Sequence, residues 1–347
     1  MSTFAITDIH LQYVTAIETQ LRNHSSSDKR SVEKLAASFG IDNKNLIKEL
    51  TELAIVRVAR SIVAKDQLTV RQRFQEIVDL YNHQVNLSQR TSQSVMLQQY
   101  STPCPIAYLA GTYILPGEKK ILNRYFEPSA GNGLLTIALP EYATIVNEID
   151  EIRSANLKTQ YFREILSQNA IYPFKLAKRF DGVITNPPFG TLDKEVMYDE
   201  YKIKTLDHLM ALRALDCMKD DGRAAIIIGG HTGWDNIGRI QAGKNWIFFN
   251  YLYHHYHVDD VINIDGHKLY SRQGTAFDVR LILISGRKEH PEGYAPLKSE
   301  KDKIVYSFSE LWDRVSPLFV NQGDIMYTEK AKARLKLLKL KLRLMTN

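Results

Sequence analysis

The chain has 347 residues, 44% of them hydrophobic and 24% charged, which is the composition of a globular protein. This length allows one large α/β domain together with a smaller helical one. The two cysteines, Cys104 and Cys217, cannot build a disulfide framework, and no CxxC motif or His/Cys cluster indicates a metal site. The sequence contains neither a signal-peptide pattern nor a run of about 18 apolar residues, so we expect a cytoplasmic protein without a membrane span or a metal.

The net charge of +6 is concentrated at the C-terminal end. Residues 325–347 contain seven lysines and arginines and a single acidic residue, a surplus equal to the net charge of the whole chain. A basic tail of this kind attracts phosphate groups, and Lys336 and Lys339 are its candidate nucleic-acid contacts. An amphipathic helix that docks on a partner protein is the alternative interpretation.

The first 88 residues predict a helical N-terminal domain. Apolar residues at helical spacing indicate a helix over residues 9–21, and two further helical segments, 31–39 and 44–54, are separated by a turn at Gly40. With Asp42 or Asn43 as the cap of the second segment, this is the pattern of a helix-turn-helix, although two helices that simply pack together give the same pattern. If the segment binds DNA, four polar residues would face the groove: Asn43, Lys44, Asn45 and Lys48.

From about residue 98, strand-like apolar runs alternate with helical segments. The predicted strands are residues 125–127, 143–148, 178–185, 224–228, 261–264 and 279–284. Their spacing of roughly 20–40 residues predicts crossover helices, and hence an α/β fold with a Rossmann-like, doubly wound, mostly parallel sheet. Ligands of such sheets bind beyond the carboxyl ends of the strands, so the residues directly after each strand form the candidate site.

A glycine-containing turn follows the first predicted strand, which ends at Glu127. Gly131 and Gly133 allow the backbone to bend tightly and approach a ligand, but neither the GxGxxG pattern nor a phosphate-binding GxxxxGK[ST] loop is present. A tight structural turn is therefore the alternative. The second strand ends near Glu148 and Asp150, where a carboxylate can accept hydrogen bonds from both hydroxyls of a ribose. Together the two motifs indicate a cofactor that contains a nucleoside.

The segment Asn186-Pro187-Pro188-Phe189 directly follows the strand 178–185 and is the candidate catalytic loop. Two prolines cannot sit in a central strand, so the chain leaves the sheet here in a stiff, extended form. The side-chain carbonyl of Asn186 and the backbone carbonyl of Pro187 can accept the two hydrogens of an aromatic amine such as adenine N6. This favours the pyramidal nitrogen that attacks a methyl group. Phe189 offers a face for stacking the base, and a duplex base would have to flip out to reach it.

These motifs, with Tyr100-Ser101-Thr102-Pro103 upstream, resemble motifs I, II, IV and X of the amino-methyltransferases, in the order of the gamma class of N6-adenine DNA methyltransferases. The resemblance spans about residues 98–286. It implies a seven-stranded methyltransferase sheet, the cofactor S-adenosyl-L-methionine, and transfer of its methyl group to adenine N6 in DNA. The cofactor-binding residues that it implies are Tyr100, Thr102, Pro103, Glu127, Pro128, Ala130, Gly131, Gly133, Glu148, Ile149, Asn169 and Asn186.

Within this implied set, Thr102 would contact the amino-acid end of the cofactor and Glu148 its ribose. Motif III of the family usually supplies an aspartate near the adenine ring of the cofactor. Here Asn169 is the best match, and an amide can still accept a hydrogen bond from the adenine amino group.

Residues 229–257 are rich in aromatic and histidine side chains. No carboxylate completes a metal site with the adjacent His254 and His255. Core packing explains most of these rings, and we expect one or two of them to stack on nucleic acid.

Other functions use the same catalytic loop. Relatives methylate RNA adenine or guanine, or glutamine side chains of proteins, and a degenerate methyltransferase fold can serve as a non-catalytic DNA-binding subunit. The segment 100–103 before motif I favours DNA adenine, so DNA is the expected partner and RNA the alternative.

The expected division of the chain is a helical domain over residues 1–88, a catalytic domain over 89–290 and a C-terminal extension over 291–347. Gamma-class enzymes usually carry a large target-recognition domain, but only about sixty residues follow Gly286. We therefore expect recognition by the N-terminal domain, by the tail or by a separate specificity subunit, or a relaxed specificity with strong salt dependence. A restriction-modification or orphan enzyme of a prokaryote, phage or mobile element is the expected context.

Overall fold

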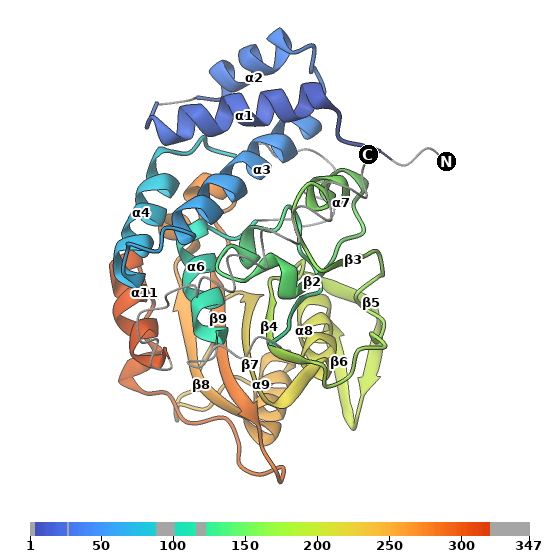
Figure 1. The fold of residues 1–347 in the computed structure, drawn as a ribbon. Helices are drawn as coiled ribbons and strands as arrows, with labels where there is room; N and C mark the ends of the chain where they lie inside the picture. The colour runs from blue at the N-terminus through green and yellow to red at the C-terminus, as the bar shows by residue number, and fades with distance from the viewer. Residues whose placement is uncertain (1–3, 26–27, 88–100, 116–122, 320–347) are drawn as a thin grey trace.

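The structure is a computed structural model, and it describes residues 4–25, 28–87, 101–115 and 123–319 (Figure 1). The N-terminal part consists of the helices α1 (Asp8–Arg22), α2 (Lys29–Ser38), α3 (Lys44–Val63) and α4 (Val70–His83). The predicted turn at Gly40 is confirmed, with a φ of +74°. Asn43 caps α3 by accepting a hydrogen bond from the Leu46 backbone N–H at 3.0 Å.

α3 is longer than the predicted segment 44–54, because its apolar residues continue to Val63. Figure 1 shows it descending from α1 and α2 into the body of the molecule. Buried side chains occur on every face of α3 between Leu46 and Ile62. A helix that reads a DNA groove needs a free face. The burial of α3 therefore favours the interpretation in which the two helices of the predicted helix-turn-helix simply pack together.

Seven strands form one sheet in the order β3-β2-β1-β4-β7-β9-β8. They are β1 (Tyr125–Glu127), β2 (Thr144–Asn147), β3 (Glu164–Leu166), β4 (Phe180–Thr185), β7 (Met218–Gly229), β8 (Tyr256–Ile264) and β9 (Val279–Arg287). Neighbouring strands from β3 to β7 are parallel, whereas β9 runs antiparallel to both β7 and β8. The predicted doubly wound, mostly parallel sheet is thus confirmed, and each predicted strand overlaps an observed one.

Alternate residues of the strands face two layers of helices. In β7, Ala225 and Ile227 belong to one hydrophobic cluster, and Ala224 and Ile226 to a second. The first cluster includes residues of α3, α4 and α6 (Cys104–Ile114). The second includes residues of α8 (Leu206–Asp216) and α9 (Lys244–His255). This sandwich buries the middle of the sheet and leaves its carboxyl edge available for a site.

The crossover between β1 and β2 differs from the prediction. In place of the expected crossover helix, the chain forms only one 3₁₀ turn, η1 (Leu134–Thr136), and a second, η2 (Glu141–Ala143), directly before β2. The N-terminal part compensates for the short crossover. Arg60 of α3 donates hydrogen bonds to the backbone carbonyl of Thr136 at 3.1 Å and to its hydroxyl at 2.8 Å.

Several other elements lie outside the predictions. A hairpin of β5 (Thr191–Tyr198) and β6 (Tyr201–Thr205) directly follows the candidate catalytic loop. The helix α7 (Glu151–Lys158) joins β2 to β3. Part of the ring-rich segment 229–257 is the helix α9, which buries Phe248, Phe249 and Tyr251. Core packing thus accounts for these three rings.

The C-terminal extension packs back on the N-terminal helices. Beyond α10 (Gly266–Leu269), the helix α11 (Phe308–Val315) places Trp312 4.9 Å from the ring of Phe74, and Phe308 5.2 Å from that of Tyr81. One hydrophobic cluster therefore includes residues of all three predicted parts of the chain. Within the described residues, no helix has the length and apolarity that crossing a membrane requires.

Candidate active site

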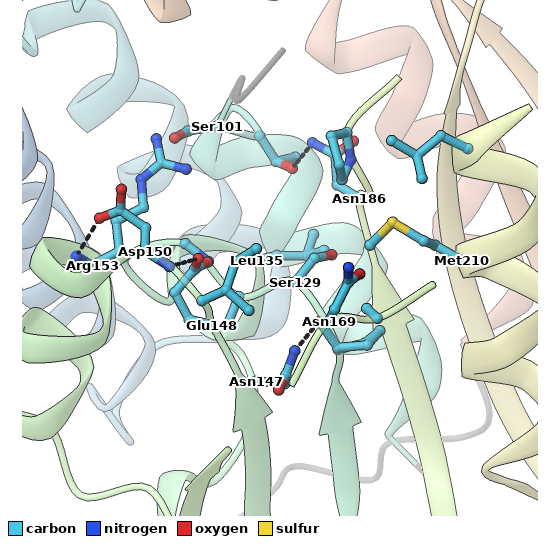
Figure 2. A pocket seen from close by; sticks show the side chains of 18 of the residues that line it. Ser101, Ser129, Leu135, Asn147, Glu148, Asp150, Arg153, Asn169, Asn186 and Met210 are labelled. Carbon is cyan, nitrogen blue, oxygen red and sulfur yellow. Dashed lines mark hydrogen bonds between the residues drawn. The ribbon is translucent and has the colours of Figure 1, made fainter. Parts of the chain in front are cut away.

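A cavity of about 840 Å³ opens at the carboxyl ends of β1, β2 and β4 (Figure 2). The walls come from the turn after β1, the residues after β2 and β3, the loop after β4, and the segment before α6. Ten of the predicted site residues line it: Thr102, Pro128, Ala130, Gly131, Glu148, Ile149, Asn169, Asn186, Pro188 and Phe189. The fold thus brings motifs that are up to about 90 residues apart in the sequence to one cavity, as expected for the carboxyl edge of such a sheet.

Other predicted residues are not part of the lining. Pro103 precedes the first residue of α6, and Pro187 is buried in the catalytic loop. Gly133 packs inward, because a Cβ there would lie 3.1 Å from Gln160 Oε1 and 3.3 Å from Leu157 Cδ2. Tyr100 lies outside the described residues.

The glycine turn brings bare backbone to the cavity. Gly131 has a φ of +55° and Gly133 a φ of +91°, which is the left-handed region that favours glycine. A Cβ added at Gly131 would meet nothing within 4 Å, in contrast to Gly133. Gly131 is therefore the glycine at which a ligand can approach the backbone closely.

Glu148 is held in place by two backbone N–H groups, one from the turn after β1 and one from the residues after β2. Its Oε2 accepts a hydrogen bond from the Gly131 N–H at 2.7 Å, and its Oε1 accepts one from the Asp150 N–H at 2.8 Å. Burial raises the pKa of this carboxyl, while the nearby Arg153 guanidinium opposes the rise. Each carboxylate oxygen can accept a second hydrogen bond, so the pair remains able to receive two neighbouring hydroxyls.

Glu127 lies below the cavity floor and is fully buried. Its Oε1 accepts hydrogen bonds from the backbone N–H and hydroxyl of Ser129, at 3.3 and 3.2 Å. Burial raises the pKa of Glu127 well above its ordinary value. In this arrangement Glu127 acts on the cavity through the shape of the turn, since Ser129 itself lines the cavity.

The amide of Asn186 is fixed by Thr102. Its Nδ2 donates a hydrogen bond to Thr102 Oγ1 at 2.9 Å, from the segment before α6 to the end of β4 (Figure 2). Thr102 is 3% exposed, so this contact is shielded from bulk water. The contact links the residue implied to bind the cofactor with the residue predicted to hold the methyl acceptor.

Phe189, which the sequence predicts to stack on the acceptor base, rests on the bare backbone of Gly229 at the end of β7. A Cβ at Gly229 would lie only 3.1 Å from the Cγ of the ring. The ring is half-buried and also lines the cavity, so one part is anchored and another is available for stacking.

Ile149 and Asn169 follow β2 and β3, respectively, and both line the cavity. The Ile149 side chain is 60% exposed, which is unusual for an isoleucine in a folded domain and leaves it free to cover a planar ring. Asn169 is exposed, and its Oδ1 accepts a hydrogen bond from the Ile171 N–H at 3.2 Å.

Several cavity residues lie outside the methyltransferase motifs, among them the polar residues Asn45 and Glu52 of α3 and Arg153 of α7. Arg153 pairs with Glu49 of α3 at 2.9 Å. The sequence contained a signal for buried polar partners of α3, because Glu49 and Glu52 interrupt an apolar helix and buried carboxylates need partners. Sequence spacing alone could not say where those partners lie.

The candidate nucleic-acid residues are dispersed. Lys44 is exposed in the first turn of α3, whereas the Lys48 side chain is only 9% exposed and lies 3.5 Å from Glu49. Asn43 caps the helix and Asn45 lines the cavity, so the four residues of the predicted helix-turn-helix do not form one groove-facing surface. Lys336 and Lys339 lie outside the described residues.

Comparisons with known proteins gave matches only among solved structures. No protein-family model matches the chain, and no curated protein does. A protein from Listeria monocytogenes, provisionally described as a class I S-adenosylmethionine-dependent methyltransferase, is 16% identical, with 90% of this chain and 92% of that chain covered and a TM-score of 0.46.

Two further structures are similar to the same degree. The methyltransferase subunit of a type I restriction-modification system from Streptococcus thermophilus is 13% identical, with 92% of this chain and 76% of that chain covered and a TM-score of 0.46. A modification subunit of a provisionally described type I restriction enzyme from Vibrio vulnificus is 14% identical, with 92% of each chain covered and a TM-score of 0.46.

The fold class follows from the sheet itself. Without the β5–β6 hairpin, the strand order in terms of position along the chain is third, second, first, fourth, fifth, seventh, sixth, with only the seventh strand reversed. This mostly parallel sheet, with helices on both faces and additional N-terminal helices, is the Rossmann-like fold of the class I methyltransferases.

Proposed function

We propose that the chain transfers the methyl group of S-adenosyl-L-methionine to the N6 amino group of adenine in DNA. One observation carries this proposal above all: Asn186 of the Asn-Pro-Pro-Phe loop lines the same cavity as Glu148, the expected ribose ligand. A methyl acceptor and a nucleoside cofactor can therefore meet in one cavity.

The cavity fits a cationic cofactor. Among the described residues, four carboxylates line it, namely Glu52, Glu148, Asp150 and Glu151, against the single cation Arg153, which is paired with Glu49. S-adenosyl-L-methionine carries a sulfonium and an ammonium, and when bound it supplies an electrophilic methyl group. Glu148 would hold the ribose, Ile149 and Asn169 the adenine, and the backbone at Gly131 the amino-acid part.

The residues of the chain contribute position and electrostatics to the reaction. Because its amide nitrogen donates a hydrogen bond to Thr102, Asn186 can direct its side-chain carbonyl toward the amine of the acceptor base. A backbone carbonyl at Pro187 would take the second hydrogen, which frees the nitrogen lone pair from the ring. Phe189 would hold the base by stacking, and the prolines would keep this loop rigid.

DNA is the proposed substrate, and a duplex base would be flipped out to enter the cavity. The hairpin β5–β6 starts directly after the loop, at the position from which it could contact the strand around a flipped base. A specificity subunit would supply target recognition, because no groove-facing helix is evident among the described residues.

The test uses purified protein with tritiated S-adenosyl-L-methionine, and offers duplex DNA, single-stranded DNA, RNA and protein in parallel. We expect label in DNA and N6-methyladenine after nucleoside analysis. We expect Asn186→Ala to lower the rate on DNA at least 100-fold, as for other positioned electrostatic contacts, and to change cofactor affinity little. Label in RNA or in protein glutamine would instead support the alternative substrates, and a fully active Asn186→Ala would contradict the catalytic assignment.

A further inference from the structure

Glu52 of α3 lines the candidate cofactor cavity, although it lies outside every methyltransferase motif. Its side chain is almost completely buried, with 1% exposure. Its two carboxylate oxygens lie 2.6 and 2.7 Å from the hydroxyl of Ser101, which also lines the cavity. A hydroxyl has only one hydrogen to donate, so the described residues leave most of the acceptor capacity of this carboxylate unused.

Glu49, one turn earlier on α3, is a buried carboxylate whose charge is balanced by a neighbouring cation. Arg153 Nε lies 2.9 Å from it, Asn132 Nδ2 donates to it at 2.6 Å, and Lys48 Nζ lies 3.5 Å away. Burial alone would raise the pKa of Glu49, but the charges of Arg153 and Lys48 and the hydrogen bonds from Arg153 and Asn132 together outweigh this effect and lower the pKa to about 2. Glu49 is thus a complete structural ion pair.

Glu52 lacks such a partner. Among the described residues, no lysine, arginine or histidine nitrogen lies within 4.0 Å of its carboxylate, although Arg153 is close enough to Glu49 for a salt bridge. Burial, and then the charge of Glu49, raise the pKa of Glu52, while the more distant charges of Arg153 and Lys48 oppose the rise. A buried carboxylate without a counter-charge in direct contact is unfavourable unless a cation reaches it. The open side of Glu52 is the cavity, so the cation would have to be part of a ligand.

We propose that Glu52 binds the α-ammonium group of S-adenosyl-L-methionine. The ammonium carries three hydrogens to donate and the sulfonium none, so the ammonium is the group that matches the free acceptor positions of Glu52. The location agrees with this assignment. Ser101, which contacts Glu52, precedes Thr102, which holds Asn186, so Glu52 lies on the acceptor side of the cavity. Glu148, the expected ribose ligand, follows β2 in the other wall (Figure 2). The inference rests on the proposed function and adds a residue of α3, from the N-terminal part of the chain, to the cofactor site.

The test compares two thioethers, in which the sulfur carries no charge, by calorimetry in the absence of DNA. S-adenosylhomocysteine carries the α-ammonium, whereas 5′-S-(3-carboxypropyl)-5′-thioadenosine is the same molecule without the amino group. We expect the full-length protein to bind the first about 10- to 100-fold more tightly, the range for a hydrogen-bonded charge. In Glu52→Gln, this preference should fall below about threefold, and in Glu52→Asp, which keeps the charge on a shorter side chain, it should be intermediate.

Glu49→Gln is the matched control, because it removes an equally buried carboxylate from the same helix. It should lower the melting temperature but leave the preference for the amino group intact. A Glu52→Gln protein that still prefers the amino compound by the wild-type factor would overturn the proposal, as would a wild-type protein that binds both thioethers equally. In those cases the proposed function would stand. A wild-type protein that binds neither S-adenosyl-L-methionine nor its thioethers would refute the proposed function itself.

Discussion

Thr102 connects the cofactor side of the cavity with the catalytic loop. The family resemblance implies that it contacts the amino-acid end of the cofactor, whereas in the structure its hydroxyl accepts the hydrogen bond from Asn186. These two roles affect different steps of the reaction. A cofactor ligand contributes to affinity, and a residue that orients Asn186 contributes to the rate of transfer.

We expect Thr102→Val to lower kcat about 5-fold, because a hydrogen bond of this kind contributes roughly 1 kcal/mol. The dissociation constant of S-adenosyl-L-methionine should change less than about threefold, and Thr102→Ser should restore most of the rate. Steady-state kinetics together with calorimetry separate the two effects. A weaker cofactor affinity with an unchanged kcat would assign Thr102 to the cofactor instead.

Glu127 makes the stability of the protein depend on pH. Burial raises its pKa in the folded state well above the ordinary value of 4.5. A carboxyl with a raised folded-state pKa contributes stability that is complete below the unfolded pKa and is lost as the pH rises through the folded value. Glu127→Gln removes this loss, since the amide stays neutral.

The melting temperature of Glu127→Gln should therefore equal that of the wild type near pH 4.5 and exceed it by an increasing margin up to pH 8. Scanning calorimetry at several pH values, without cofactor, measures the difference. The other buried carboxyls are present in both proteins, so their effects cancel to first order. A difference that does not change with pH would show that Glu127 is not the group that titrates.

At the scale of elements, the sequence predicts the part of the fold that has a strong periodic signal. β1, β2 and β4 coincide with runs of apolar residues and are followed by motifs, so the carboxyl edge and ten of the lining residues could be identified. β3 could not, because it has three residues, and Glu164 is exposed. The hairpin β5–β6 carries charged residues on its exposed positions and has no strong turn signal.

The two glycines of the turn after β1 offer a direct comparison within one element. Both have a positive φ, but only Gly133 is enclosed by side chains. Gly133→Ala should destabilise the protein by about 1–3 kcal/mol, because a methyl group would meet Leu157 and Phe162 in a strained backbone. Gly131→Ala should cost only about 1 kcal/mol, the backbone part alone.

Cofactor binding should respond in the opposite order. Gly131 lines the cavity, so a methyl group there would stand where the ligand approaches, and affinity should fall at least 10-fold. Gly133→Ala should bind the cofactor normally at a temperature where it is folded. Urea unfolding and calorimetry on both variants check this, and equal losses of affinity would contradict the assignment of Gly131.

At the scale of the whole molecule, the main difference from the sequence-based expectation is the role of the N-terminal helices. They were expected to form a separate domain. The sequence pattern cannot show which element a helix packs against, because an amphipathic helix buries its apolar side against any apolar partner. In the structure, α3 supplies part of the cavity wall, and its residue Arg60 donates a hydrogen bond to the backbone of the crossover between β1 and β2. The division of the chain at residue 88 remains a prediction that unfolding experiments can test.

We expect the full chain to unfold in one cooperative transition, because a single hydrophobic cluster includes residues of α1, α3, α6, α11 and the sheet. The three tryptophans report on different regions. The ring of Trp312 in α11 lies 4.9 Å from that of Phe74 in α4, whereas Trp234 and Trp246 lie in the segment of the chain that connects β7 to β8. Urea unfolding followed by the fluorescence of Trp234→Phe/Trp246→Phe and of Trp312→Phe proteins should therefore give coincident midpoints, equal to the midpoint from circular dichroism. If the N-terminal helices were an independent domain, the Trp312 signal would change at a different urea concentration from the other two. An independent N-terminal domain would also mean that a chain beginning at residue 101 binds S-adenosyl-L-methionine by itself. We expect that such a chain does not bind it, because it lacks α3.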